Sequence, residues 1–395
     1  MEITAIRCVR RRGTMYEYPD GTFTERILRP TDVYPEFRET GPERDDAGDG
    51  PRDLSQVFVE VDTDAGVTGV AGPVADLTAR AVLDVADVLV GLNALATAKV
   101  QDVLFGRWDD ATAGTRLRAA SAIDVALWDA RGKHYGAPVH ELLGGPTRTE
   151  LPCYASMLGF STDPDSVRER AAEYADRGFP AQKWFFRHGP GSGEDGKAEN
   201  VAMAEAAREA VGDGDDLMFD AWRSWGMDYA MDMLDRLAPS DPRWLEQPLD
   251  KQYRDGYARL VREAPFPIAG GEHDATRWDF REVLSAGALE VLQPEPFYTG
   301  GVTETDRVCT LGSTHGVTVV PHGNSVPVNV QLVAAQPPSL CPYVEFLVQR
   351  NATNQFFFEE TVWPEDGHVA VPDRPGIGVT IDDSVVESET ELSGP

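Results

Sequence analysis

The sequence predicts an α/β protein in which a compact α+β domain precedes a (β/α) barrel. Residues 1–145 contain a strand pattern, a hairpin pattern and then a long run of helical periodicity. From about residue 150, eight short apolar runs follow, with amphipathic stretches between most of them. Several runs end in a polar residue, and a parallel barrel carries its chemistry at that end of its strands.

The N-terminal elements follow from local patterns. "MEITAIRCVRRRG" has the alternation of a strand, and "SQVFVEVDTDAGVTGVAG" predicts a hairpin around an Asp-Ala-Gly turn. Between them, residues 15–53 are rich in Pro, Gly and charge, and a loop of that length is either functional or disordered. Helical periodicity covers about residues 76–143 and ends in "AIDVALWDARGKHYGAPVHELLGG". Strands followed by helices predict a compact α+β unit.

The barrel is expected over residues 146–350. Its predicted strands are "LPCYAS", "AQKWFF", "DLMFD", "RWLEQP", "FPIAGGE", "LEVLQPE", "VTVVPHG" and "YVEFLV". Amphipathic stretches such as "KAENVAMAEAAREAVG" supply the intervening helices. Residues 351–395 are expected to pack back on the N-terminal domain and to end in an acidic tail.

Composition excludes some partners and suggests an environment. Asp plus Glu number 66 against 36 Lys plus Arg, and the net charge of -30 repels nucleic acid and anionic membranes. The chain has five lysines and thirty-one arginines. This acidic, lysine-poor composition is typical of a halophilic protein, because high salt screens the repulsion between its acidic side chains. The alternative is an ordinary acidic cytosolic protein.

Cysteine usage and hydropathy predict a cytoplasmic protein. The four cysteines (Cys8, Cys153, Cys309 and Cys341) have no zinc-ligand spacing and are interpreted as reduced packing residues. No signal peptide is apparent at the N-terminus. The most apolar stretch is interrupted by Asp84 and Asp87, which favours an amphipathic helix over a membrane span.

Three carboxylates predict a metal site. Asp220, Glu246 and Glu272 follow successive strand patterns at intervals of 26 residues, the length of one strand, helix and loop. Adjacent strands of a barrel bring such ends together, and crowded carboxylates repel one another unless a cation neutralises them. Oxygen ligands without His or Cys favour a hard ion, and Mg²⁺ is the expected cofactor.

Other polar residues at strand ends predict acid–base chemistry. His322 follows "VVP", and Glu295 ends the preceding strand, where a carboxylate orients an imidazole and raises its pKa as a general base needs. Lys183 lies in the apolar run "AQKWFF" and is expected to bind an anionic substrate, stabilise developing charge or act as a second acid or base. The alternative is a packed lysine stem with a solvated head. His273 and Glu345 are further candidates.

Together these pieces resemble the mandelate racemase and muconate lactonizing group of the enolase superfamily. The helix motif "AIDVALWDARGKHYGAPVHELLGG", the metal-ligand set of Asp220, Glu246 and Glu272, and the dyad of His322 with Glu295 carry the resemblance nearly end to end. Within the group, "DAWRSW", "FRHGP", "GEH", "PHGNS", "EFL" and "PGIGV" are most similar to rhamnonate dehydratase and related acid-sugar dehydratases.

The resemblance implies a barrel of the modified TIM type, an N-terminal domain that caps it through loop 15–53, and a homo-oligomer. It also implies Mg²⁺-assisted removal of the proton α to a carboxylate, here the first step in dehydration of a small sugar acid (an aldonate). The implied substrate contacts are Glu345, His273, Trp222, Arg26 and His188, and the capping loop adds Arg29, Tyr34 and Arg38 as candidates.

Three departures bear on the reaction. Glu295 stands where the dyad partner is usually Asp, and Phe185 and Trp222 stand where racemising and cycloisomerising members commonly carry a second Lys and an Asn. The two latter changes weaken a two-base racemase reading. A racemase or epimerase of a 2-hydroxy acid stays as one alternative, and a catalytically reduced, ligand-binding regulatory protein as another. A zinc hydrolase and a dinucleotide oxidoreductase are disfavoured because their motifs are missing.

Overall fold

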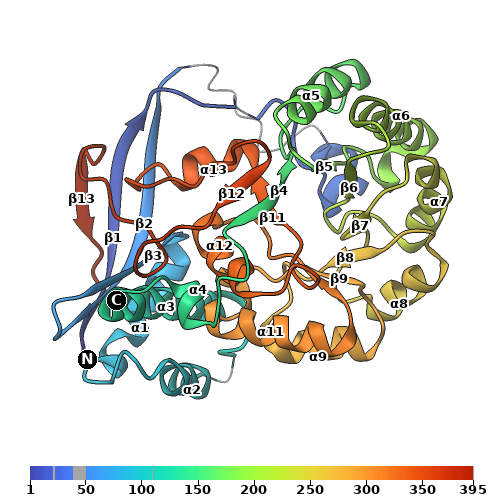
Figure 1. Cartoon of the computed structure of the whole chain (residues 1–395). Helices are drawn as coiled ribbons and strands as arrows, with labels where there is room; N and C mark the ends of the chain where they lie inside the picture. Colours follow the sequence, from blue (N-terminus) through green and yellow to red (C-terminus); the bar gives the residue numbers. More distant parts are fainter. Residues whose placement is uncertain (21–22, 39–49, 109, 395) are drawn as a thin grey trace.

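The N-terminal domain is built on an antiparallel sheet in the computed structural model, which describes residues 1–20, 23–38, 50–108 and 110–394. The strand order is β13-β1-β2-β3, with β1 (Ile3–Met15), β2 (Arg52–Thr63), β3 (Thr68–Val74) and β13 (Ser388–Glu391). The domain's helices are α1 (Asp76–Leu89), α2 (Thr97–Arg107), α3 (Gly114–Tyr135) and α4 (Val139–Leu142). Helices α1 and α3 pack against the sheet, and α2 and α4 pack against α3 (Figure 1).

All eight predicted barrel strands are present, which confirms the predicted fold class. They are β4 (Glu150–Ser156), β5 (Ala181–Phe185), β6 (Asp216–Asp220), β7 (Trp244–Glu246), β8 (Ile268–Gly270), β9 (Val291–Leu292), β10 (Thr318–Val319) and β11 (Val344–Leu347). They run parallel in the order β10-β9-β8-β7-β6-β5-β4-β11. Between the end strands, the backbone N–H of Val319 donates to the carbonyl of Leu340 at 2.8 Å, which links β10 to the segment before β11.

Helices surround this curled sheet and separate its strands along the chain (Figure 1). They are α5 (Pro164–Asp176), α6 (Gly193–Val211), α7 (Met227–Leu237), α8 (Arg254–Glu263), α9 (Thr276–Ser285), α10 (Pro296–Thr299), α11 (Gly301–His315) and α12 (Val326–Ala335), with 3₁₀ turns η3 (Pro190–Ser192) and η4 (Ala238–Ser240). Inside the barrel, a buried apolar floor separates the polar strand ends from the opposite face; it consists of Tyr154, Ala181, Met218, Trp244, Ala269, Val291 and Val320. The floor leaves the carboxyl ends of the strands as the mouth.

Helix α3, which carries the "AIDVALWDARGK" motif, joins separate parts of the molecule. Its buried Asp129 accepts hydrogen bonds from the backbone N–H groups of Val70 in β3 at 2.8 Å and of Ile377 in the C-terminal segment at 2.9 Å. Lys133, one turn further on, pairs with the same carboxylate at 2.6 Å. A single side chain therefore ties the sheet, the helix and the C-terminal segment together.

The same helix also contacts the barrel. Asp124 accepts hydrogen bonds from the backbone N–H and the hydroxyl of Thr303 in α11, at 2.9 and 2.6 Å. The indole of Trp128 donates to that hydroxyl at 2.8 Å. These contacts fix the orientation of the N-terminal domain on the barrel.

The C-terminal segment returns to both parts of the fold. After α13 (Val348–Asn354), strand β12 (His368–Ala370) pairs antiparallel with β4, and β13 pairs antiparallel with β1. Both termini lie on the N-terminal domain (Figure 1). No helix within the described ranges is long and apolar enough to cross a membrane.

The predicted lid loop, residues 15–53, is described in part, and residues 21–22 and 39–49 lie outside the described residues. The described part contains two short 3₁₀ turns, η1 (Pro30–Val33) and η2 (Pro35–Phe37). Phe23 and Ile27 of this loop pack with side chains at the barrel mouth, namely Leu158, Phe185, Trp222 and Leu347. The loop therefore lies over the mouth.

Candidate active site

The predicted metal-binding carboxylates lie on neighbouring strand ends. Asp220 and Glu246 are the last residues of β6 and β7, and they are register partners in the parallel ladder. Glu272 follows β8 within two residues. All three side chains are buried. The 26-residue spacing thus brings the three carboxylates to one edge of the sheet, as predicted.

Lys183 lies among these carboxylates. Its Nζ is 2.8 Å from Glu246 Oε2, 2.7 Å from Glu345 Oε1 and 3.6 Å from Asp220 Oδ2, and its side chain is fully buried. Burial opposes the charged form, but the charges of Glu246 and Glu345 raise the pKa of Lys183 well above its usual range. Lys183 is therefore a fixed ammonium that compensates the carboxylates.

Glu345, predicted as a substrate contact, has partners on both carboxylate oxygens. Besides Lys183, its Oε1 accepts a hydrogen bond from the Ser156 hydroxyl at 2.7 Å, and its Oε2 accepts one from the Gly323 N–H at 2.7 Å. Burial alone would raise the pKa of Glu345, but the charges of Lys183 and His322 lower it to about 2. This carboxylate stays ionised and links β11, β4 and the segment after β10.

Glu246 has one occupied and one unpartnered oxygen. Its Oε2 accepts from Lys183 and, at 2.5 Å, from the Gln293 amide, whereas the buried Oε1 has no hydrogen-bond partner in the described part of the chain. Burial and the neighbouring charge of Glu246 raise the pKa of Asp220 well above its usual range. Both features indicate a shortage of positive charge at this edge.

The donor set fits a hard divalent cation. Five buried carboxylates, on Asp220, Glu246, Glu272, Glu295 and Glu345, share two nearby cationic groups, Lys183 and His322. An unpartnered buried carboxylate oxygen and an excess of negative charge are what Mg²⁺ coordination satisfies. Within the described ranges, no three His, Cys, Asp or Glu side chains are arranged around one point as metal ligands. Their oxygens instead contact Lys183 and His322.

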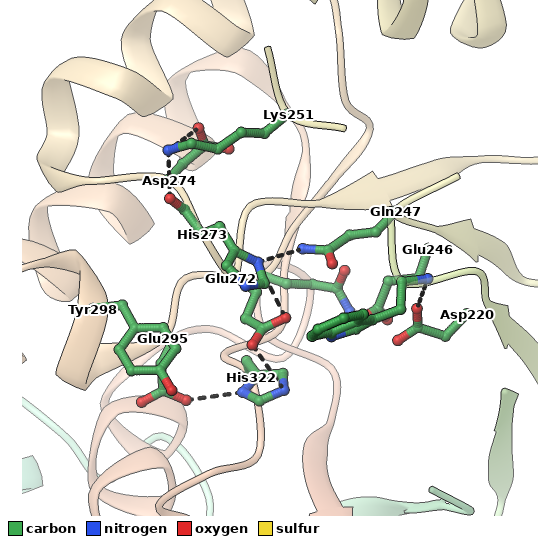
Figure 2. A network of polar contacts seen from close by, with 12 residues as sticks. Asp220, Glu246, Gln247, Lys251, Glu272, His273, Asp274, Glu295, Tyr298 and His322 are labelled. Carbon is green, nitrogen blue, oxygen red and sulfur yellow. Dashed lines mark hydrogen bonds and ion pairs between the residues drawn. The ribbon is translucent and has the colours of Figure 1, made fainter. Parts of the chain in front are cut away.

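The predicted dyad is formed on the other side of the mouth. His322 Nδ1 lies 2.9 Å from Glu295 Oε2, and its Nε2 lies 3.7 Å from Glu272 Oε1. Figure 2 shows the imidazole between these two carboxylates. Burial opposes protonation, but Glu272 and Glu295 raise the pKa of His322 to about 10. The imidazole thus bridges the dyad and the metal-ligand set.

His273 and Trp222 also lie at the mouth, as predicted. The His273 imidazole is near Gln247 Nε2 and Glu272 Oε2, each at 3.4 Å from Nδ1, and burial together with the charge of Arg223 lowers its pKa to about 3. Trp222 follows Asp220 in a left-handed conformation (φ 41°), and its N–H donates to Asp220 Oδ1 at 2.7 Å. Such strained backbone is concentrated at functional sites.

The predicted substrate contacts in the lid and outer wall have other partners. Arg26 forms a bidentate pair with Asp32 at 2.8 Å for each contact and also donates to lid carbonyls. His188 pairs with Glu199 at 2.9 Å and contacts the Ser192 hydroxyl at 3.2 Å. These side chains hold local structure. Arg26 Nε has no hydrogen-bond partner within the described residues, and substrate contacts by Arg26 and His188 stay predictions.

The other lid candidates, Tyr34, Arg38 and Arg29, differ in their exposure and contacts. Tyr34 is 56% exposed, and Arg38 donates to the carbonyl of Asp32 at 2.9 Å. Arg29 lies over the Trp222 ring, with its guanidinium carbon 5.8 Å from the ring centroid. Arg29 is therefore the lid candidate that contacts Trp222, a residue beside the predicted metal ligand Asp220.

Several polar residues of the site were not predicted. Ser156, Gln247, Gln293 and Tyr298 contact the predicted residues or lie beside them. The alternation of strand residues could have indicated Gln293. It lies two positions before Glu295, and residues two apart in a strand point to the same face of the sheet. Gln247 has a left-handed backbone (φ 43°), which no local sequence pattern indicates.

A curled parallel sheet with a carboxylate-rich mouth and an antiparallel capping domain defines a barrel enzyme of the enolase type. The family model for enolase C-terminal domain-like proteins matches residues 166–385, and that for the N-terminal domain of mandelate racemase and muconate lactonizing enzymes matches residues 51–144. The chain belongs to this mandelate racemase/muconate lactonizing enzyme family of the enolase superfamily, which confirms the resemblance seen in the sequence.

Curated relatives include a cycloisomerase and a dehydratase. D-galactarolactone cycloisomerase of Agrobacterium fabrum is 35% identical over 344 residues, covering 83% of this chain and 89% of that protein. L-rhamnonate dehydratase of Saccharopolyspora erythraea is 31% identical over 405 residues, covering 98% of each. Both similarities extend over most of the two chains compared.

Solved structures show the same architecture. The 3,6-anhydro-D-galactonate cycloisomerase of Zobellia galactanivorans matches with a TM-score of 0.79 and 25% identity, over 98% of this chain and 100% of that one. A racemase of Streptomyces coelicolor with bound magnesium matches with a TM-score of 0.78 and 27% identity, over 97% and 98%. The relatives thus include dehydratase, cycloisomerase and racemase activities on one fold.

Proposed function

We propose that this enzyme is a Mg²⁺-dependent dehydratase of a sugar acid, with an aldonate as the reference substrate. The observation that carries the proposal is the asymmetry of the mouth. His322 has an orienting carboxylate and a side chain that is 12% exposed, whereas Lys183 is enclosed by carboxylates and only 1% exposed. One available acid–base group suits elimination, because racemisation needs a proton donor on each face of the carbon.

In the proposed reaction, a cation held by Asp220, Glu246 and Glu272 would offset the Glu272 charge that raises the pKa of His322, so that the imidazole is neutral. His322 Nε2 then takes the proton from C2, the carbon next to the substrate carboxylate. The electron pair left at C2 is delocalised into the carboxylate as an enediolate, and its return forms a C2–C3 double bond as the C3–O bond breaks. The departing hydroxyl takes a proton from the imidazolium and leaves as water. The resulting enol tautomerises, gaining a proton at C3, to a 2-keto-3-deoxy acid.

In this proposal, Glu295 and Lys183 act through their charges and positions. Glu295 holds Nδ1 of His322, so that Nε2 is the nitrogen available to the substrate. Lys183 supplies a fixed positive charge beneath the mouth, where it attenuates the repulsion between an acidic substrate and the site's carboxylates. Substrate binding through Glu345, His273 and Trp222 is consistent with their places at the mouth.

Asp220, Glu246 and Glu272 would hold the cation in this proposal. The chemistry that a bound Mg²⁺ supplies is positive charge beside the substrate carboxylate, which stabilises the enediolate formed by proton removal. Residues of the chain perform the proton transfers. The relative named L-rhamnonate dehydratase, which aligns with nearly the whole chain, supports this reaction class.

The test is proton NMR in D₂O of the purified enzyme with Mg²⁺ in high salt, against a panel of aldonates. We expect signals of a 3-deoxy position in the product of at least one substrate. Deuterium entering at C2 without those signals would instead support a racemase or epimerase, the activity named for one structural neighbour. Ligand-induced stabilisation with no product from any acid would support a regulatory binding protein.

A further inference from the structure

A cavity lies where the capping domain meets the barrel. Its volume is about 150 Å³, large enough for several water molecules. The capping domain contributes Thr78 of α1 and Arg118 of α3 to its lining, and the barrel contributes Tyr298, Asn324 and Ser325. The lining therefore spans both domains and combines these polar residues with apolar ones such as Val74 and Phe297.

The cavity adjoins the catalytic dyad. Tyr298 lies three residues after Glu295, and Asn324 lies two residues after His322. The Asn324 amide donates to the Tyr298 hydroxyl at 3.4 Å, and the Tyr298 ring lies 6.4 Å from the His273 ring. Figure 2 shows Tyr298 beside Glu295, on the dyad side of the site. The cavity therefore lies beside the segments that carry the dyad, and the proposal below places the distal end of the substrate there.

Arg118 is the cationic residue of this lining. Its guanidinium carbon lies 3.9 Å from the centroid of the Tyr298 ring, and its described contacts include no ion pair with a carboxylate. Acidic residues outnumber basic ones by 66 to 36 in this chain, so a guanidinium to which the described residues offer no acidic partner is unusual here. The positive charge of Arg118 also contributes to the low pKa of His273, which places it within electrostatic range of the site.

We propose that Arg118 and this cavity bind a second carboxylate at the far end of the substrate, so that the enzyme prefers diacid sugars (aldarates) to the corresponding aldonates. The inference rests on the proposed dehydratase function and narrows its substrate class. Guanidinium groups bind carboxylates through paired hydrogen bonds, and Asn324 and Ser325 offer hydrogen bonds to neighbouring hydroxyls. A diacid needs such a cation, since the carboxylate-rich mouth otherwise repels its second charge.

The test compares matched aldarate and aldonate pairs of gluco, galacto and manno configuration, with wild type and Arg118→Met. We expect wild type to favour the aldarate of at least one pair by about 10- to 100-fold in kcat/KM. Arg118→Met should remove that preference by raising KM for the aldarate with little change in kcat, because the contact is made equally in the ground and transition states.

Arg131→Met is the matched control. Arg131 lies on the same helix and also lies over an aromatic ring, with its guanidinium carbon 4.7 Å from the Trp128 centroid, but it does not line the cavity. The control should keep the diacid preference. Equal rates for both members of every pair in wild type, or an equal loss for both members in Arg118→Met, would overturn the proposal.

Calorimetric binding of the same pairs to the Mg²⁺-loaded proteins separates this inference from the proposed function. If no acid of these pairs or of the aldonate panel is dehydrated, the dehydratase proposal fails. Tighter binding of an aldarate to wild type than to Arg118→Met would still support the cavity as a carboxylate site. Equal binding of every aldarate to the two proteins would overturn it.

Discussion

Glu295 holds His322 with one carboxylate oxygen and its own backbone turn with the other. Oε2 lies 2.9 Å from His322 Nδ1, and Oε1 accepts a hydrogen bond from the N–H of Phe297 at 3.0 Å, in the first turn of α10. Glutamate stands where this family usually has aspartate, and the longer side chain makes both contacts. The dyad is therefore anchored to the backbone that follows β9.

Two substitutions of Glu295 should distinguish the effect of its charge from the effect of its side-chain length. Glu295→Gln keeps the length but removes the charge that stabilises an imidazolium, so we expect kcat to fall about 100-fold or more. Glu295→Asp keeps the charge but is one methylene shorter, so one of its two contacts is lost and an intermediate kcat is expected. Steady-state kinetics measures both variants, and full activity of Glu295→Gln would contradict the assigned role.

Glu246→Gln should weaken Mg²⁺ binding. Its unpartnered buried oxygen is the ligand atom that the structure offers most directly, so a loss of about tenfold or more in affinity is expected by titration calorimetry. Glu209→Gln is a suitable control because Glu209 is exposed and paired with Arg168 at the surface. Equal Mg²⁺ affinity in the two variants would count against the carboxylate set.

Lys183→Met should destabilise the fold in the presence of EDTA. The substitution leaves buried carboxylates without their ammonium partner, and breaking a buried pair in this way costs about 3–5 kcal/mol. Added Mg²⁺ should recover part of that loss. Lys197→Met is the control, since Lys197 is partly exposed and pairs with Asp232. Denaturant unfolding measures the free energy of unfolding of both variants. Equal values would show that Lys183 does not stabilise the fold by compensating the buried carboxylates.

Deprotonation of Asp124 should lower the free energy of unfolding as the pH rises from 4 to 7. Burial raises the pKa of Asp124 from 3.8 to about 7 although Thr303 donates two hydrogen bonds to it. The folded state therefore binds this proton more tightly than the unfolded state does. Its contribution is fully present below pH 4 and is lost as pH rises through 7, by at most roughly 4 kcal/mol.

The variant Asp124→Asn tests this pH dependence. The amide does not titrate and still offers an oxygen to the Thr303 N–H, so the stability difference between pH 5 and pH 8 should be smaller than in wild type. Urea unfolding at both pH values measures the difference. An unchanged difference would show that Asp124 does not titrate in that range.

Local patterns were sufficient for the strands and their polar ends. Each barrel strand is a short apolar run, and the repeat of strand, helix and loop sets the spacing between Asp220, Glu246 and Glu272. Parallel pairing then brings the ends together without further information. The fold, the carboxylate cluster and the dyad contact therefore followed from the regular repeat of strand, helix and loop.

Contacts between distant segments were not predictable in this way. Lys183 pairs with Glu345, 162 positions away, and Arg118 lies over Tyr298, 180 positions away. Arg26 was expected to contact substrate, but its partner Asp32 lies in the same loop, whose conformation has no periodicity to read. Side-chain partners of this kind depend on tertiary packing.

The measurement that tests the central claim most directly is product formation by His322→Asn in D₂O, followed by proton NMR with the best substrate of wild type. We predict 3-deoxy product from wild type and none from the variant, with Mg²⁺ affinity of the variant retained by calorimetry. Product from His322→Asn at a rate near that of wild type would contradict His322 as the base that takes the C2 proton.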